Sequence, residues 1–221
     1  MTFEVETLKV QKALRILLWG VGVVLVLTIG LAIWQYPEPY EFFGEHVSNL
    51  GGIQSETLLN NYNSSMIMII GFGFFAAISF AMAIIYFVSK RIKFNITKGV
   101  LTLAIAGGAA GVAVPRDHST LYQWHYVGAA LFILGFAAYN FVCQARRYYR
   151  KHGFIPEKKN FNFWIDFIFV WIVLAAFVMY MVVFLLMHFT SYTNILSGPI
   201  AQKIVLIVDL IAVIIFDTND M

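Results

Sequence analysis

Four of the five histidines lie in the polar stretches between apolar segments or near the ends of such segments, on one predicted side of the membrane, and these positions suit metal ligands. They are His46, His118, His125 and His188. With Asp117 or Glu45 they form a candidate zinc site, because imidazole and carboxylate are common zinc ligands. A catalytic zinc takes about three protein ligands and one water, and that water could attack an ester or amide in a lipid headgroup. The sequence has no HExxH motif, however, and no two of these residues have a diagnostic spacing.

Two alternatives need no metal. The histidines either form a structural network of hydrogen bonds or bind a lipid headgroup without chemistry. His118 and His125 are seven residues apart, which is about two helical turns, so they share one face if the helix containing His125 begins early.

A lipid headgroup is the ligand that a second set of residues fits. Ser48, Arg116, Asp117 and His125 all lie between or beside apolar segments, near aromatic and glutamate-rich residues. Arg116 either pairs with a glutamate of the 35–64 segment or with Asp117, or holds a lipid phosphate by two hydrogen bonds. We favour binding over catalysis for this set.

Asp209 and Lys203 interrupt the last apolar segment. An ionisable group inside a membrane is costly and marks a functional site by default. Lys203 either faces the interior or extends toward the nearer membrane surface. A proton or ion path would need further groups, and Asn140 and Asp166 are the ones that the sequence offers.

The elements that position these residues are predicted from composition. The chain has 221 residues, of which 60% are hydrophobic and 12% charged, and its mean hydropathy is +0.77. Soluble domains carry about 25% charged residues, so this chain lacks the polar residues to cover a core in water. The basic residues lie between apolar blocks, which argues against nucleic acid as a partner. The one cysteine, Cys143, lies in an apolar run and excludes an intrachain disulfide.

Six apolar segments are long enough to cross a bilayer, which needs about 20 residues as a helix. They are roughly 14–34, 65–89, 98–115, 121–145, 162–189 and 199–216, with a polar loop at 35–64. Helices are required because lipid offers no partner to open backbone groups. The sequence therefore predicts an all-α, single-domain bundle of six transmembrane helices.

Basic residues set the orientation. Of the 15 lysines and arginines, 13 lie in three groups: before or at the start of the first segment, between the second and the start of the third, and between the fourth and fifth. By the positive-inside rule these positions are cytoplasmic. We expect an integral multi-pass protein with both termini in the cytoplasm and the 35–64 loop outside.

A small-residue pair in the third segment predicts close helix packing. Gly107 and Gly111 have the small-xxx-small spacing that lets two backbones approach in lipid. We expect an intramolecular seam at this pair; a homodimer face is the alternative.

Short motifs around the loop resemble the Frag–DRAM–Sfk group of membrane proteins and its uncharacterised prokaryotic relatives. The residues that carry the resemblance are Val47-Ser48-Asn49-Leu50-Gly51, then Asn60-Asn61-Tyr62-Asn63-Ser64, then Val114-Pro115-Arg116-Asp117 followed by His125. The resemblance covers most of the chain. It implies about six spans and a role in lipid handling or membrane organisation, and it implies no catalytic mechanism.

Three functions follow as hypotheses. The first is binding of a lipid headgroup or similar amphiphile at the outer polar residues, with membrane lipids as partners. The second is a metal-dependent lipid hydrolase that uses zinc at the outer histidines. The third is a subunit or scaffold of a larger complex, with other proteins in the bilayer as partners and no site of its own.

Overall fold

Helices make up almost all of the computed structural model, which describes residues 2–90, 92–154, 161–189 and 198–215, the side chains of residues 2–7 and of His188 excepted. The elements are α1 (Thr2–Gln35), the short 3-10 helix η1 (Val47–Gly51), α2 (Tyr62–Val88), α3 (Asn95–Val112), α4 (Tyr122–His152), α5 (Phe161–Phe189) and α6 (Gly198–Ile215). Within these residues the extended backbone is limited to one isolated bridge between Gln54 and Asn60. The all-α prediction is confirmed.

All six long helices are apolar enough and long enough to cross a membrane. This indicates an integral multi-pass membrane protein, as the composition predicted. The predicted segment at 98–115 is shifted, because α3 begins at Asn95 and ends at Val112. The last turn of α4 is basic and ends at Gly153, whose φ of 73° suits a residue without a side chain. Basic side chains in a last turn also offset the helix dipole.

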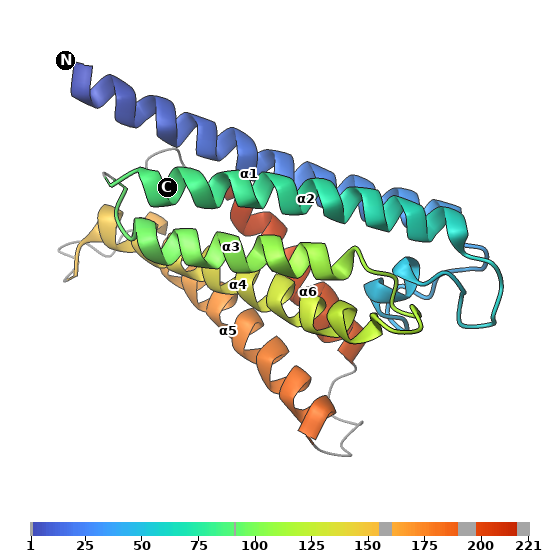
Figure 1. Cartoon of the computed structure of the whole chain (residues 1–221). Coiled ribbons are helices and arrows are strands. Elements are labelled where there is room, and N and C mark those ends of the chain that lie inside the picture. The colour runs from blue at the N-terminus through green and yellow to red at the C-terminus, as the bar shows by residue number, and fades with distance from the viewer. Residues whose placement is uncertain (1, 91, 155–160, 190–197, 216–221) are drawn as a thin grey trace.

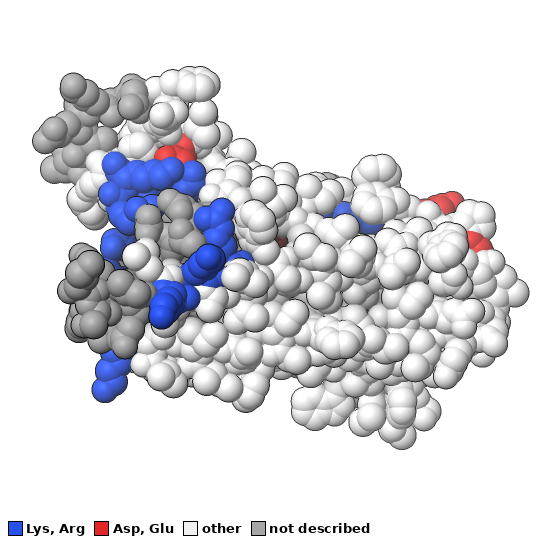
Figure 2. Space-filling view, turned by 90° about the horizontal axis from the view of Figure 1, so that it is seen from above, with Lys and Arg blue, Asp and Glu red and all other residues white. Residues whose placement is uncertain are grey.

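The helices run side by side in chain order from α1 to α4, and α5 leans away from the bundle as it proceeds (Figure 1). We call the end with the 36–61 loop the loop end. The opposite end, where α2 and α4 finish, is the basic end, and lysine and arginine side chains gather there (Figure 2). Which end faces the cytoplasm stays a prediction.

Aromatic side chains fill the core between α2 and α4. Phe75 and Phe132 meet edge to face with ring centroids 4.8 Å apart, and Phe72 and Phe136 extend the cluster. Edge-to-face geometry places the positive ring edge against the negative face. The outward side chains of the helices are mostly large and apolar, such as Trp19 and Phe74, as expected for surfaces in lipid.

Helices α3 and α4 touch backbone to backbone at glycines. A Cβ placed on Gly128 would lie 2.6 Å from the Cα of Gly111 and 2.8 Å from the carbonyl oxygen of Gly108. Gly107 has nothing within 4 Å of such an atom. The intramolecular seam is confirmed and Gly111 belongs to it, but the expectation for Gly107 is wrong. The rotation of α3 turns its neighbour Gly108 to the seam instead.

Candidate functional site

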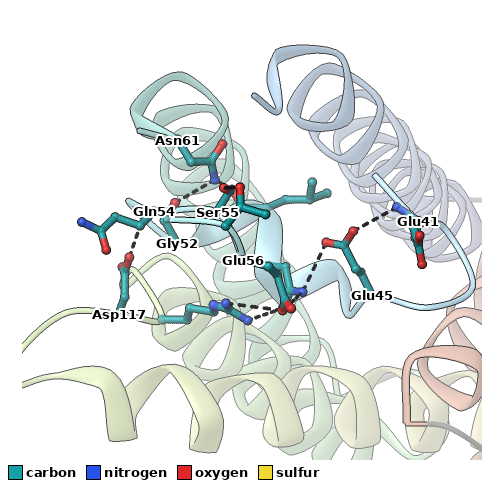
Figure 3. A network of polar contacts seen from close by, with 12 residues as sticks. Glu41, Glu45, Gly52, Gln54, Ser55, Glu56, Asn61 and Asp117 are labelled. Carbon is teal, nitrogen blue, oxygen red and sulfur yellow. Dashed lines mark hydrogen bonds and ion pairs between the residues drawn. The ribbon is translucent and has the colours of Figure 1, made fainter. Parts of the chain in front are cut away.

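A compact polar cap closes the loop end. Its centre is η1, whose carbonyl groups point at the first turn of α2. Leu50 accepts hydrogen bonds from Ser64 Oγ (2.9 Å) and Asn61 Nδ2 (3.2 Å), and Gly51 accepts one from Ser65 Oγ (3.1 Å). Asn61 Nδ2 also donates to Gly52 (2.8 Å; Figure 3). The asparagine- and serine-rich segment therefore holds the loop against α2.

Arg116 lies under the loop and bonds to it. Its guanidinium donates to Asn49 Oδ1 and lies 3.7 Å from the Glu56 carboxylate. Asn49 Nδ2 donates in turn to Glu56 (2.7 Å) and Glu45 (3.4 Å). Of the expected alternatives, the structure has Arg116 paired with a loop glutamate and not with Asp117. Asn49, the buried hub of these contacts, was missed, since nothing in the sequence distinguishes it from the asparagines that follow it.

Asp117 binds the loop backbone with both oxygens. Oδ1 accepts from the amide of Ile53 (2.9 Å), and Oδ2 accepts from the amide of Gln54 (2.8 Å; Figure 3). These bonds join the turn after α3 to the segment before α2. Hydrogen bonds to a carboxylate are stronger than bonds between neutral groups. The described contacts of Asp117 thus fix the shape of the cap.

The candidate metal ligands His118 and His125 form hydrogen bonds with different partners. His125 is buried, and its Nδ1 donates to the carbonyl of Val114 at 2.6 Å, because a carbonyl can only accept. His118 Nδ1 accepts from the amides of Thr120 and Leu121, both at 3.3 Å. Helix α4 begins at Tyr122, after His118, so the early start under which His118 and His125 would share a helical face does not occur.

No metal-binding group emerges among the residues that the structure describes. Nowhere among them do three or more His, Cys, Asp or Glu side chains gather to hold an ion. His188 lies in α5, but its side chain is outside the described residues. The zinc hypothesis therefore has no assembled ligand set to build on.

The start of α6 holds the other side of the cap. Gln202 Oε1 accepts from the amide of Val47 (2.9 Å), and the Lys203 amine donates to the Glu45 carbonyl. The same amine lies 5.5 Å from the Tyr40 ring centroid and 5.1 Å from that of Phe42, within cation–π range. Lys203 does extend toward the loop end, but it is only 4% exposed, so it ends in the cap and not in water.

Tyr36 and His46 of the loop keep their neutral forms. Burial and the Glu45 carboxylate raise the pKa of Tyr36 to about 12, so its hydroxyl keeps its proton and donates to Glu45. Burial and the nearby Lys203 charge lower the pKa of His46. His46 is therefore uncharged at neutral pH, which spares the cap a second cation beside Lys203.

Ser48 lines a small internal cavity beneath the cap. The cavity has a volume of about 20 Å³, and Gln202 is its other polar side chain. This volume is sufficient for about one water molecule. Ser48 therefore lies apart from the contacts of Arg116 and Asp117, and the four predicted headgroup-binding residues do not form one open site.

A much larger hollow lies elsewhere, on the side of the bundle. It is bounded by Leu101 and Ala104 of α3, by one face of α4 from Gln123 to Ala138, and by Phe177, Met181 and Phe184 of α5. We call it the lateral groove. Its volume is about 780 Å³, which is within the range of about 300–1,000 Å³ typical of ligand sites. It arises where α5 leans away from α4 (Figure 1).

The groove is apolar along most of its length and polar at one end. Gln123 and Tyr126 are its polar side chains, and both lie in the first turns of α4, next to the loop end. The sequence analysis missed this site, because apolar side chains facing a groove and those facing lipid look alike in sequence. The tilt of α5 creates the site.

Comparisons of the chain with protein-family models, with curated proteins and with solved structures find no match. The fold and the site define the class: an integral multi-pass membrane protein whose six long helices carry a polar cap and a lateral groove. The resemblance to the Frag–DRAM–Sfk group stays a prediction.

Proposed function

We propose that this protein binds a lipid or similar amphiphile in the lateral groove, with the apolar chain against α3, α4 and α5 and the polar head at the loop end. The single observation that carries the proposal is the distribution of polarity in the groove, which is apolar except for Gln123 and Tyr126 at one end. An amphiphile has the same distribution. Apolar walls with a few polar groups at fixed places are typical of ligand sites.

This proposal keeps the lipid ligand that the sequence suggested, but it puts the ligand in the lateral groove and not at Arg116 and Asp117. Arg116 and Asp117 use their polar atoms to hold the loop, which favours a structural role for them. If the basic end is cytoplasmic, as the positive-inside rule predicts, the headgroup lies at the outer surface of the membrane.

Filling the groove tests the proposal. We expect Ala130→Trp to lower the amount of lipid that stays bound through purification by about tenfold, equal to about 1.4 kcal/mol of binding free energy. Ala130 lines the groove, and an indole there occupies the space of the apolar chain. Native mass spectrometry of protein released gently from detergent measures the bound lipid.

Ala77→Trp is the matched control. Ala77 is an exposed residue of α2 and does not line the groove, so this variant adds the same bulk to the helix surface. Unchanged lipid retention in Ala130→Trp, with the protein folded as the control is, would refute binding in the groove.

A further inference from the structure

A carboxyl group and an amide meet in the middle of the bundle, away from both the cap and the groove. Asn140 Nδ2 of α4 donates to Asp209 Oδ1 of α6 at 2.9 Å and approaches the Asp209 carbonyl at 3.4 Å. Asp209 is 1% exposed and Asn140 is 0% exposed. Each keeps one buried oxygen, Asp209 Oδ2 and Asn140 Oδ1, that has no hydrogen-bond partner among the described residues.

Burying these two oxygens without hydrogen-bond partners costs folding free energy. A charged carboxylate in an apolar interior pays a large desolvation cost unless it is paired, and such groups usually become neutral instead. Helix α4 supplies only the amide of Asn140, which carries no charge to balance the carboxylate. A proton on Asp209 would remove the charge and turn Oδ2 into a donor, while Asn140 Oδ1 is an acceptor of the same pair.

Polar groups continue from this pair to the basic end. Asn140, Gln144 and Arg147 are spaced by four and three residues, so they lie along one face of α4. Gln144 Nε2 donates to the Ala212 carbonyl of α6 (3.2 Å), and Arg147 Nη1 donates to Gln144 Oε1 (3.3 Å). These three residues therefore form a polar row that runs from the bundle interior toward the basic end.

The row ends in an ionic cluster around Asp166 of α5. This carboxylate lies 3.1 Å from Arg147, 3.5 Å from Lys151 and 3.0 Å from His152. The sequence analysis named Asn140 and Asp166 as the groups available to a proton or ion path. It missed Gln144 and Arg147, although a polar residue at each turn of this part of α4 indicates them. The cluster lies at the basic end, where the Lys151 side chain is 37% exposed and connects it to water.

From Asp209 toward the cap, the side chains of the bundle interior are apolar. Gln202 lies two turns before Asp209 on α6, and Leu206, which lies between them in sequence, lines the small cavity with Phe132 and Ile133. Among the described residues, a polar row therefore reaches Asp209 from the basic end and none reaches it from the cap.

We propose that Asp209 is a proton-binding site that exchanges with the basic end of the bundle through Gln144, Arg147 and the Asp166 cluster. The step is a simple protonation: a hydronium ion at the basic end gives its proton to Asp209 Oδ2 and becomes water, and the reverse step returns the proton. Gln144 and Arg147 line the path as hydrogen-bonding groups for the water that carries the proton, because a guanidinium has no acceptor and does not itself take up a proton. A metal cation fits less well, because Mg²⁺ and Ca²⁺ take about six or more oxygen ligands and this pair has two unpartnered oxygens.

Other charged groups lie on the helices around this pair. On the elements that pack against α6, the described charged groups are Lys9, Lys12 and Arg15 of α1, Arg146, Arg147, Arg150, Lys151 and His152 of α4, Asp166 of α5, and Glu45 in the cap. Other described titratable groups on these helices include His125, Tyr139 and Cys143 of α4 and Tyr180 of α5. Lys203 of α6 itself is held by the cap. None of them is hydrogen bonded to Asp209, so its protonation responds to pH through the row.

Infrared difference spectroscopy of the full chain in lipid vesicles tests the proposal. The carbonyl stretch of a protonated carboxyl group is separate from that of a carboxylate, and it shifts when the proton is exchanged for deuterium. We expect a protonated-carboxyl band at neutral pH that is lost in Asp209→Asn. We also expect Gln144→Leu to slow its deuterium exchange by about tenfold or more, because removal of a polar group from the path raises the barrier.

Two results would overturn the proposal. One is a wild-type spectrum without a protonated-carboxyl band that depends on Asp209, which would make the group a carboxylate. The other is exchange that is equally fast in Gln144→Leu and in the wild type, which would exclude the row as the path. A wild-type spectrum with no protonated-carboxyl band at all needs no variant, so it overturns the proposal even where Asp209→Asn folds poorly. Lipid retention is unaffected by either outcome, so this test is independent of the groove.

Discussion

Gly108→Ala is expected to destabilise the bundle by about 1–3 kcal/mol or more, the usual cost of overpacking a tight contact. A Cβ on Gly108 would meet backbone atoms of Phe132 and Gly128 in α4, and backbone cannot rotate away as a flexible side chain can. The two helices must therefore separate or tilt. Because α3 and α4 both line the lateral groove, we also expect this variant to retain less lipid.

The preceding residue supplies the control. Gly107 is exposed and has open space at its Cβ position, so Gly107→Ala should be neutral or gain up to about 1 kcal/mol of helix propensity. Thermal unfolding of both variants in the same detergent measures the difference. Equal midpoints for the two alanine variants would contradict the backbone contact between α3 and α4.

Asp117→Ala is expected to loosen the cap and to cost about 1.5–3 kcal/mol for each charge-assisted hydrogen bond, less the share that water restores at this exposed site. The variant leaves the amides of Ile53 and Gln54 without their acceptor. The loop between α1 and α2 contains Glu38, Glu41, Glu45 and Glu56 and no lysine or arginine. A glutamate-specific protease should therefore cleave this loop faster in the variant.

Asp117→Asn should fall between the wild type and Asp117→Ala, because an amide offers one acceptor oxygen where a carboxylate offers two. Ser119→Ala, two residues away on the same exposed turn, should leave the cleavage rate unchanged. If Asp117→Ala resists the protease as well as the wild type does, other contacts hold the loop and this role for Asp117 is wrong.

The helices were predictable from sequence because a chain that lies in lipid needs long apolar segments. Lipid requires long apolar segments, and these dominate the composition so strongly that each predicted segment overlaps a helix of the structure. The sixth segment, interrupted by Lys203 and Asp209, is a continuous helix from Gly198 to Ile215. Its polar residues are accommodated by partners on other elements, which a single segment cannot reveal.

The contacts of the site were not predictable in the same way. Whether Gly107 or Gly108 faces α4 depends on a rotation of α3 by one residue, and both glycines fit the small-residue pattern. The partners of Asp117 are backbone amides, which every residue carries, so no residue type marks them. The lateral groove depends on the tilt of α5, and apolar sequence is equally compatible with a helix that packs closely.

Photo-crosslinking in the native membrane tests the lateral groove as a lipid site most directly. A photoreactive residue at Leu131, which lines the groove, is compared with one at Ile84 of α2, which does not. The two side chains are similarly exposed, 44% and 49%. We predict that Leu131 crosslinks a narrow set of amphiphiles enriched over the surrounding membrane, while Ile84 crosslinks the bulk lipids. The same lipid composition at both positions would contradict a binding site in the groove.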